Sequence, residues 1–310
     1  MDRTPPLIVV TGPTGAGKTA LALALARDFP LEVVSADSMQ VYRHMDIATA
    51  KPSRQEQAVL PHTLIDIREP DEEINAGMFM DLASRAIPEI RSRGRIPLVV
   101  GGTGLYIKAL LYGLAPAPPR SPELRAWLRA RAEEKGSAAL WETLRRYDPE
   151  SAEKTSRNDV VRIVRSLEIA FLTGLRPSGV LRGHGFSTPR FEARVVCVMP
   201  ERDSLYRAID ARVEGMFEAG LVEETRHLLD LGFDPGLRSM QTLAYKHVVG
   251  LLEGALNFES ALGRIRRDTR HYAKRQVTWM RSHHERKVFQ APGRALETLS
   301  GWLEDLLAFR

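Results

Sequence analysis

The chain has 310 residues, of which 44% are hydrophobic and 27% are charged. This composition is typical of a soluble globular protein with one or two domains. No apolar run approaches the roughly 18 residues of a membrane span, and the first residues lack the profile of a secretory signal. The one cysteine, Cys197, lies in an apolar run, which excludes an internal disulfide and disfavours a cysteine metal site. We therefore expect a cytoplasmic protein without membrane contact.

The net charge of +5 is unevenly distributed along the chain. Residues 121–190 contain 13 Lys/Arg against 9 Asp/Glu, residues 260–290 contain 9 against 2, and the remainder contains 22 against 28. Two basic segments on an otherwise acidic chain suit a large polyanion such as a nucleic acid. Solvated helix surfaces would give the same distribution, so charge alone leaves both interpretations open.

A glycine-rich turn between a strand-like and a helix-like segment carries the strongest chemical signal. Apolar residues 7–10 precede it and the Ala/Leu-rich segment 19–27 follows it. The turn matches the G-x-x-x-x-G-K-[ST] pattern and consists of Gly12, Pro13, Thr14, Gly15, Ala16, Gly17, Lys18 and Thr19. The N–H groups of such a turn bind phosphate oxygens, the lysine adds a positive charge, and the threonine hydroxyl can ligate Mg²⁺. The sequence therefore predicts a polyphosphate site.

Hydrophobic periodicity predicts an α/β fold with an insertion. Strands are expected at 7–10, 31–36, 63–67, 96–100 and 193–199, with a helix at 78–93. Such alternation indicates a P-loop NTPase-like parallel sheet with helices on both faces. After a proline-rich crossing at 115–122, the pattern is helical over 123–173, loop-like over 176–190, and helical again from 200 onward. We expect a catalytic core of residues 1–115 and 191–310 and an all-helical insertion of residues 116–190.

Polar residues follow two of the predicted strands. Asp37 comes after the strand at 31–36, so it lies at the carboxyl edge of the sheet, where such folds bind ligands. It could accept a proton from a nucleophile, or serve only as a helix cap or Asx-turn residue. Gln40 can present a donor and an acceptor to an adenine edge. Thr103, in the turn 101–104, could donate its hydroxyl to a phosphate or bridging oxygen, although such a turn can also be purely structural.

The sequence contains no strong candidate for the acidic residue that hydrolytic P-loop proteins use. Such proteins carry an Asp at the end of a strand, where it holds Mg²⁺, whereas the strand at 96–100 is followed by Gly-Gly-Thr. Asp66 is an alternative, but it lies in a short segment. This pattern disfavours a hydrolase and leaves room for a ligand that is only a diphosphate.

Several arginines occur at spacings that suit anions. Arg162 and Arg165 lie at i and i+3 on one predicted helix face, which suits nucleic-acid phosphates or, equally, solvent. Arg212 could reach the phosphate site as a cationic clamp. The segment 264–281 contains seven Lys/Arg, one Asp and two aromatic residues, a density that favours contact with a phosphate backbone.

Seven motifs in chain order, between about residues 7 and 282, together resemble the bacterial tRNA dimethylallyltransferase (tRNA isopentenyltransferase) family. They lie at 12–19, 37–42, 62–66, 101–106, 162–169, 212–216 and 272–279. The resemblance implies transfer of a dimethylallyl group from dimethylallyl diphosphate to the exocyclic amine of the adenosine 3′ of the anticodon. The acceptors would be tRNAs that read codons beginning with U. It also implies diphosphate release, Mg²⁺ as cofactor, the anticodon stem-loop of tRNA as partner, and a monomer.

The same resemblance implies a role for individual residues. Residues 14–19 would hold the diphosphate, with Lys18 and Arg212 offsetting its charge and Thr19 on the metal. Asp37 would be the general base, and Thr103 would contact both substrates. The residues expected to contact tRNA are Asp37, Ser38, Met39, Gln40, Thr103, Arg125, Val161, Arg162, Ile163, Val164 and Arg165.

Three departures from the family pattern affect fine contacts and leave the reaction unchanged. Gly15-Ala16 stands where Ala-Ser is common, His62-Thr63 replaces a His-His pair, and Leu243–His247 replaces Ile-Gly-Tyr-Lys-Glu. Two other enzyme classes also contain a P-loop: a small-molecule kinase and an adenylate isopentenyltransferase that acts on a free nucleotide. The helical insertion and the basic segment favour an RNA acceptor over both, and Lys18-Thr19 disfavours a non-catalytic RNA-binding module.

Overall fold

The computed structural model describes residues 5–282 and 287–308. Contacts divide the chain into two compact units, each of which is described by itself. The larger unit runs up to Leu111 and resumes at Arg190, and the smaller unit is Tyr112–Pro189.

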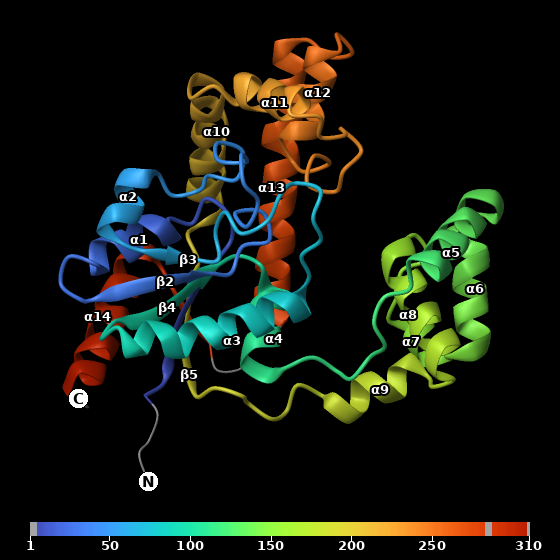
Figure 1. Ribbon diagram of the computed structural model, residues 1–310, viewed down its shortest axis with the longest axis horizontal. Helices are drawn as coiled ribbons and strands as arrows, with labels where there is room; N and C mark the ends of the chain where they lie inside the picture. The colour runs from blue at the N-terminus through green and yellow to red at the C-terminus, as the bar shows by residue number, and fades with distance from the viewer. Residues whose placement is uncertain (1–4, 283–286, 309–310) are drawn as a thin grey trace. The chain divides into compact units, whose positions relative to one another are not determined.

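A parallel sheet with the order β3-β2-β4-β1-β5-β6 forms the centre of the larger unit (Figure 1). Its strands are β1 (Leu7–Thr11), β2 (Leu31–Ser35), β3 (His62–Thr63), β4 (Ile96–Gly101), β5 (Ala193–Val198) and β6 (Lys287–Gln290). Ile8 of β1 lies between Leu98 of β4 and Arg194 of β5, so the segment after β1 emerges in the middle of the carboxyl edge. The predicted α/β fold with a parallel sheet is confirmed. The prediction of only helices after residue 200 is wrong at 287–290, where four residues add the edge strand β6.

Helices cover both faces of this sheet. The helices described in the larger unit are α1 (Lys18–Leu25), α2 (Arg54–Val59), α3 (Ala76–Ser92), α4 (Gly104–Tyr112), α10 (Arg202–Glu218), α11 (Leu221–Asp230), α12 (Tyr245–Leu252), α13 (Phe258–Ser282) and α14 (Pro292–Ala308). Because side chains alternate along a strand, Ile8 and Val10 face α1 and α14, where Leu25 and Leu303 are buried with them. Helix α3 packs against β2 and β4. The sheet is therefore buried on both sides, as parallel sheets usually are.

A second core in the larger unit joins helices α10 to α13 to the loop that follows β2. Val41 and Met45 of this loop are fully buried among Ile209, Tyr245 and Ile265 of those helices. The loop that carries Asp37 is thus anchored by apolar packing at its far end.

The smaller unit is entirely helical among its described elements. It contains α5 (Pro122–Lys135), α6 (Ser137–Tyr147), α7 (Pro149–Glu153), α8 (Val160–Thr173) and α9 (Pro177–His184). Leu128, Leu144, Ile163 and Leu167 form its buried core. The loop expected over 176–190 is wrong where α9 lies, because Pro177 occupies the first helical turn, a position at which proline is favourable.

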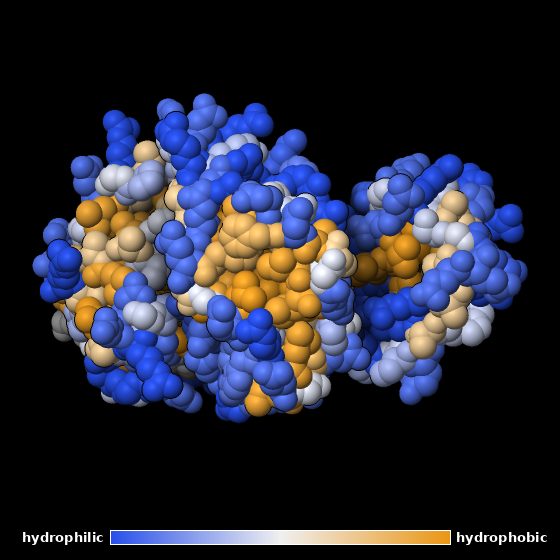
Figure 2. All heavy atoms as spheres, turned by 90° about the horizontal axis from the view of Figure 1, so that it is seen from above, coloured by the Kyte–Doolittle hydropathy of each residue, from blue (hydrophilic) through white to orange (hydrophobic). Residues whose placement is uncertain are grey.

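On the face seen in Figure 2, most side chains are hydrophilic and the apolar side chains gather in a few areas. None of the helices within residues 5–282 and 287–308 has the length and hydrophobicity of a membrane-spanning segment.

Candidate active site

The turn between β1 and α1 has the backbone conformation that phosphate binding needs. Gly17 caps α1 with a φ of 81°, in the left-handed region that glycine adopts most readily. The amide nitrogens that start α1 therefore open toward one concavity, with the positive end of the helix dipole behind them. The Lys18 ammonium lies over the turn and donates hydrogen bonds to the carbonyls of Gly12, at 3.0 Å, and Pro13, at 2.9 Å. We call residues 12–19 the phosphate cradle.

The charges of Lys18, Arg212 and Asp37 interact at the cradle. Burial lowers the pKa of Lys18 to about 8, although the nearby Asp37 charge opposes the shift. Burial also lowers the pKa of Arg212, and the Asp37 charge again opposes it. Within the described chain, the buried Nε of Arg212 has no hydrogen-bond partner, while another guanidinium nitrogen donates to the Thr14 hydroxyl at 3.1 Å. A buried guanidinium with an unsatisfied N–H is suited to an anion.

Asp37 sits at the start of the loop after β2, as the sequence predicts. Its Oδ1 accepts the backbone N–H of Met39 at 2.8 Å and, more weakly, that of Gln40 at 3.4 Å, so the carboxylate makes the contacts of an Asx turn. A turn of this kind leaves a carboxylate with further acceptor capacity. The turn therefore holds Asp37 in place without excluding a role in proton transfer.

Thr103 lies beside this turn. Its Oγ1 accepts the N–H of Ser38 at 3.1 Å and donates to the Ser38 hydroxyl at 3.5 Å. The Thr103 N–H donates to the carbonyl of Ala36 at 3.2 Å. The segment after β4 and the segment after β2 are thus joined side by side at the carboxyl edge of the sheet.

Gln40 was expected to contact an adenine, and its amide group already has protein partners. Its oxygen accepts the Ser35 hydroxyl at 3.1 Å, and its nitrogen donates to the carbonyls of Thr49 and Ala50. In this structure Gln40 braces the loop, and an adenine contact would have to replace these bonds. Met39 packs against the core that anchors the same loop.

Asp66, the alternative metal-binding acid, forms an ion pair with the buried ammonium of Lys51. The same lysine also binds Asp46. The strand expected at 63–67 is wrong beyond Thr63, because β3 covers only His62–Thr63, and Asp66 lies in the loop that follows it. Its ion pair gives Asp66 a structural role in the loop, which disfavours it as a metal ligand.

The metal candidate that remains is Thr19. The described residues contain no cluster of three or more His, Cys, Asp or Glu side chains that could hold a metal ion. Mg²⁺ commonly takes one or two protein oxygens and completes its shell with phosphate oxygens and water. A single hydroxyl at the start of α1 fits that mode of binding.

The residues of the smaller unit that were expected to contact tRNA fall into three groups. Ile163 and Val164 are 0% and 2% exposed and belong to its core, so the expected contact with tRNA is wrong for these two side chains. Val161 is 73% exposed and the Arg162 side chain 71%, so they remain accessible. Arg125 and Arg165 have a different role, in a buried ion pair.

Glu168, whose side chain is fully buried, holds both of these arginines. Arg125 donates to its two oxygens at 2.7 and 2.8 Å, Arg165 also pairs with it, and the Ser121 N–H donates at 2.8 Å. Burial alone would raise the pKa of Glu168, but these donors outweigh it and lower the pKa to about 2. Arg125 therefore fixes α5 to α8, whereas Arg165 pairs with Glu168 within α8. Both arginines have fewer donors to offer a nucleic acid.

The basic helix α13 is also partly neutralised within the protein. Arg266 pairs with Glu214 and Arg270 with Asp210, both on α10. The exposed residues Lys274 and Arg275 lie further along the helix. The expected phosphate-backbone surface is therefore smaller than the sequence run suggests.

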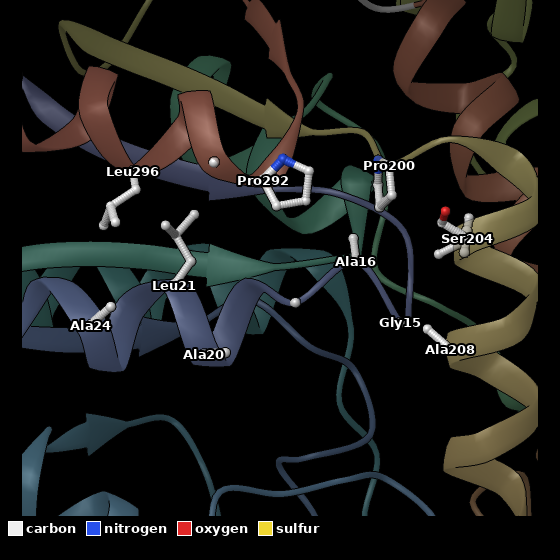
Figure 3. A pocket seen from close by; sticks show the side chains of 13 residues that line it. Gly15, Ala16, Ala20, Leu21, Ala24, Pro200, Ser204, Ala208, Pro292 and Leu296 are labelled. Atoms are coloured by element: carbon white, nitrogen blue, oxygen red, sulfur yellow. The ribbon is translucent and has the colours of Figure 1, made fainter.

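An apolar pocket of about 420 Å³ lies beside the cradle, between α1, α10 and the start of α14 (Figure 3). Leu21, Leu205, Pro292 and Leu296 are among its lining residues. Gly15, Ala16 and Gly17 of the cradle also line it, whereas the two cations and Asp37 do not.

The fold and the cradle define an α/β protein with a P-loop-type turn beside a carboxylate. A family model described as IPP transferase matches residues 40–283. A tRNA dimethylallyltransferase 1 of Pelobacter propionicus is 44% identical over 281 residues, which cover 91% of each chain. Its counterpart in Syntrophotalea carbinolica is 46% identical over 278 residues, which cover 90% of this chain and 88% of the relative. The chain therefore belongs to the IPP transferase family, as its motifs predicted.

Solved structures agree with this assignment. A tRNA isopentenylpyrophosphate transferase from Bacillus halodurans superposes with a TM-score of 0.69 at 35% identity, covering 97% of this chain and 98% of that one. A eukaryotic dimethylallyltransferase acting on tRNA gives a TM-score of 0.79 at 30% identity, covering 93% of this chain and 74% of that one. The chain is thus an enzyme of the prenyltransferase class.

Proposed function

We propose that the protein transfers the dimethylallyl group of dimethylallyl diphosphate to the exocyclic amine of the adenosine 3′ of the anticodon. The acceptors are tRNAs that read codons beginning with U. The observation that carries this proposal is the pair of buried cations, Lys18 and Arg212, beside a phosphate cradle and a carboxylate. Such a site binds a diphosphate as leaving group and offers a base to the incoming amine.

In the reaction, a C–N bond forms between the amine and the dimethylallyl carbon while the C–O bond to the diphosphate breaks. Negative charge then accumulates on the leaving oxygens, where the cradle N–H groups, Lys18 and Arg212 stabilise it. Asp37 accepts the proton that the amine loses. Thr103, bonded to Ser38 beside this carboxylate, aligns the two substrates.

The Thr19 hydroxyl would hold Mg²⁺, and the ion would supply further positive charge to the diphosphate. The protein residues bind and orient the donor independently of it. The enzyme acts as a cytoplasmic monomer.

The tRNA is bound through the anticodon stem-loop, with Val161 and Arg162 of the smaller unit among the contacts. Their exposure supports this role. The target adenine leaves its stack to reach Asp37, because a stacked base cannot present its amine to a side chain in a cleft.

Incubation with labelled dimethylallyl diphosphate, Mg²⁺ and unmodified tRNA tests the proposal. We expect label in the tRNA, and mass analysis of its nucleosides should place the added group on one adenosine. A tRNA with guanosine at that position serves as the control and should stay unlabelled. Label that remains in the donor, ATP-dependent phosphorylation, or transfer to free AMP but not to tRNA would refute the proposal.

A further inference from the structure

Helix α13 touches the phosphate cradle through one buried side chain. Gln276 is 8% exposed, and its Oε1 accepts the backbone N–H of Thr14 at 2.8 Å. Its Nε2 donates to the carbonyl of Gly102 at 3.0 Å. One amide group therefore bonds to both glycine turns, the cradle after β1 and the turn 101–104 after β4.

The second turn is shaped to receive this helix. A Cβ on Gly102 would lie 2.5 Å from Gln276 Nε2, and a Cβ on Gly104 would lie 2.2 Å from the ring of Trp279. Real Cβ atoms do not approach neighbours this closely, so glycine at both positions permits the contact with α13. The absence of side chains at these two positions therefore leaves room for Gln276 and Trp279.

Three hydrogen bonds, joined by neighbouring residues of the chain, link the cradle to the proposed base. The path runs from Thr14 to Gln276, from Gln276 to Gly102, and through the adjoining Thr103 to Ser38. Asp37 directly precedes Ser38 in the chain, and the turn that its carboxylate caps holds it in place. Because the cradle and Asp37 follow different strands, this path links two groups whose separation decides whether the donor carbon meets the amine.

We propose that Gln276 is a positioning residue that fixes the distance between the phosphate cradle and the Asp37 carboxylate. The inference rests on the proposed function, in which the cradle holds the leaving group and Asp37 takes the proton. Gln276 contacts neither group's reacting atoms. Loss of Gln276 should therefore affect the alignment of the cradle with Asp37 more than the affinity of the cradle for the donor. Misplacement of reacting groups by about 1 Å commonly costs about a hundredfold in rate.

Two variants separate positioning from general stability. Gln276→Met keeps the length of the side chain and removes both hydrogen bonds, and we expect kcat to fall about ten- to a hundredfold. The KM for dimethylallyl diphosphate and the Kd for inorganic diphosphate should change far less. Gln276→Glu keeps an acceptor for Thr14 but, when ionised, has no donor for Gly102. The introduced carboxyl can donate only when protonated, so kcat relative to wild type should rise as pH falls from about 8.5 to 6.5, whereas the methionine variant should show no such recovery.

Gln241 provides a matched control in the larger unit. It is exposed, and its Nε2 donates to a carbonyl, that of Pro235, at 2.8 Å. Gln241→Met and Gln241→Glu make the same chemical changes away from the two turns. Both should leave kcat, KM and the pH profile unchanged.

Amide hydrogen exchange adds a readout that does not depend on transfer. In Gln276→Met, peptides covering the cradle and residues 101–104 should exchange faster, while those of β1 and β4 stay protected. Unchanged exchange, or a kcat within twofold of wild type, would overturn the inference. Absence of transfer by the wild-type protein, with faster exchange in the variant, would instead refute the proposed function and leave the link through Gln276 standing.

Discussion

Replacing Lys18 with methionine should make the ligand-free protein more stable and diphosphate binding weaker. A pKa lowered from 10.5 to about 8 means that keeping the ammonium charged in the folded site costs roughly 3 kcal/mol. Methionine avoids this cost but also loses the hydrogen bonds to the Gly12 and Pro13 carbonyls, each worth about 1 kcal/mol. We expect a net gain of about 1–2 kcal/mol in the free energy of unfolding near pH 7.

The stability gained in Lys18→Met should decrease as pH rises above about 8. Because the folded pKa lies below the unfolded value, the unfolded chain binds more protons between about pH 8 and 10.5, and stability rises with pH across that window. The cost is fully present below about pH 8 and disappears above about pH 10.5. The difference between variant and wild type should therefore be larger at pH 7 than at pH 9.5, as denaturant titration at both values would show.

Lys18→Met should weaken diphosphate binding although it stabilises the ligand-free protein. Loss of a charge-assisted contact worth about 1.5–3 kcal/mol weakens the Kd for inorganic diphosphate about ten- to a hundredfold by calorimetry. Wild-type affinity should also fall above about pH 8 relative to the methionine variant, as Lys18 loses its proton. Lys274→Met, at an exposed position on α13, is the control for both measurements. Equal diphosphate affinity in Lys18→Met and wild type would refute the reasoning.

Three further changes test other parts of the structure. Asp37→Asn keeps the turn acceptor but removes the base, so kcat should fall about 10²–10⁴-fold. The Kd for inorganic diphosphate should decrease, because a negative charge has left the site. Unchanged turnover would contradict the role assigned to Asp37. Glu168→Gln leaves two arginines without their anion and should destabilise the smaller unit by about 3–5 kcal/mol, detected by limited proteolysis. In the wild type, the stabilisation from Glu168 is present above pH 4.5 and is lost as pH falls toward about 2. Gly104→Ala should cost about 1–3 kcal/mol through overpacking against Trp279, whereas Gly263→Ala in α13, where a Cβ meets only open space, should be neutral or stabilising in thermal unfolding.

Local sequence patterns predicted most of the larger unit. Four of the strands occur close to where apolar runs indicated, whereas the strand expected at 63–67 is reduced to β3 at His62–Thr63. The cradle and Asp37 stand where their motifs placed them. The misses have local causes. Strand β6 is too short to show a clear period, and Pro177 was interpreted as a loop signal although proline is equally suited to the start of a helix.

Residue partnerships could not be predicted in the same way. Gln276 meets Thr14 across 262 positions of sequence, and nothing in the local pattern around either residue indicates the other. The spacing of Arg165 and the family resemblance of Arg125 predict contacts with nucleic acid. Whether Arg125 faces a phosphate or a buried carboxylate depends on the position of Glu168, which is decided by how α5 packs against α8.

The strand order has a consequence for synthesis on the ribosome. Strand β1 must wait for β5, about 180 residues later in the chain, before its second edge is paired, and the cradle must wait longer still for α13. A nascent chain that ends before residue 276 lacks Gln276. Under the positioning role proposed for Gln276, the alignment of the cradle with Asp37 is therefore completed only as translation nears its end.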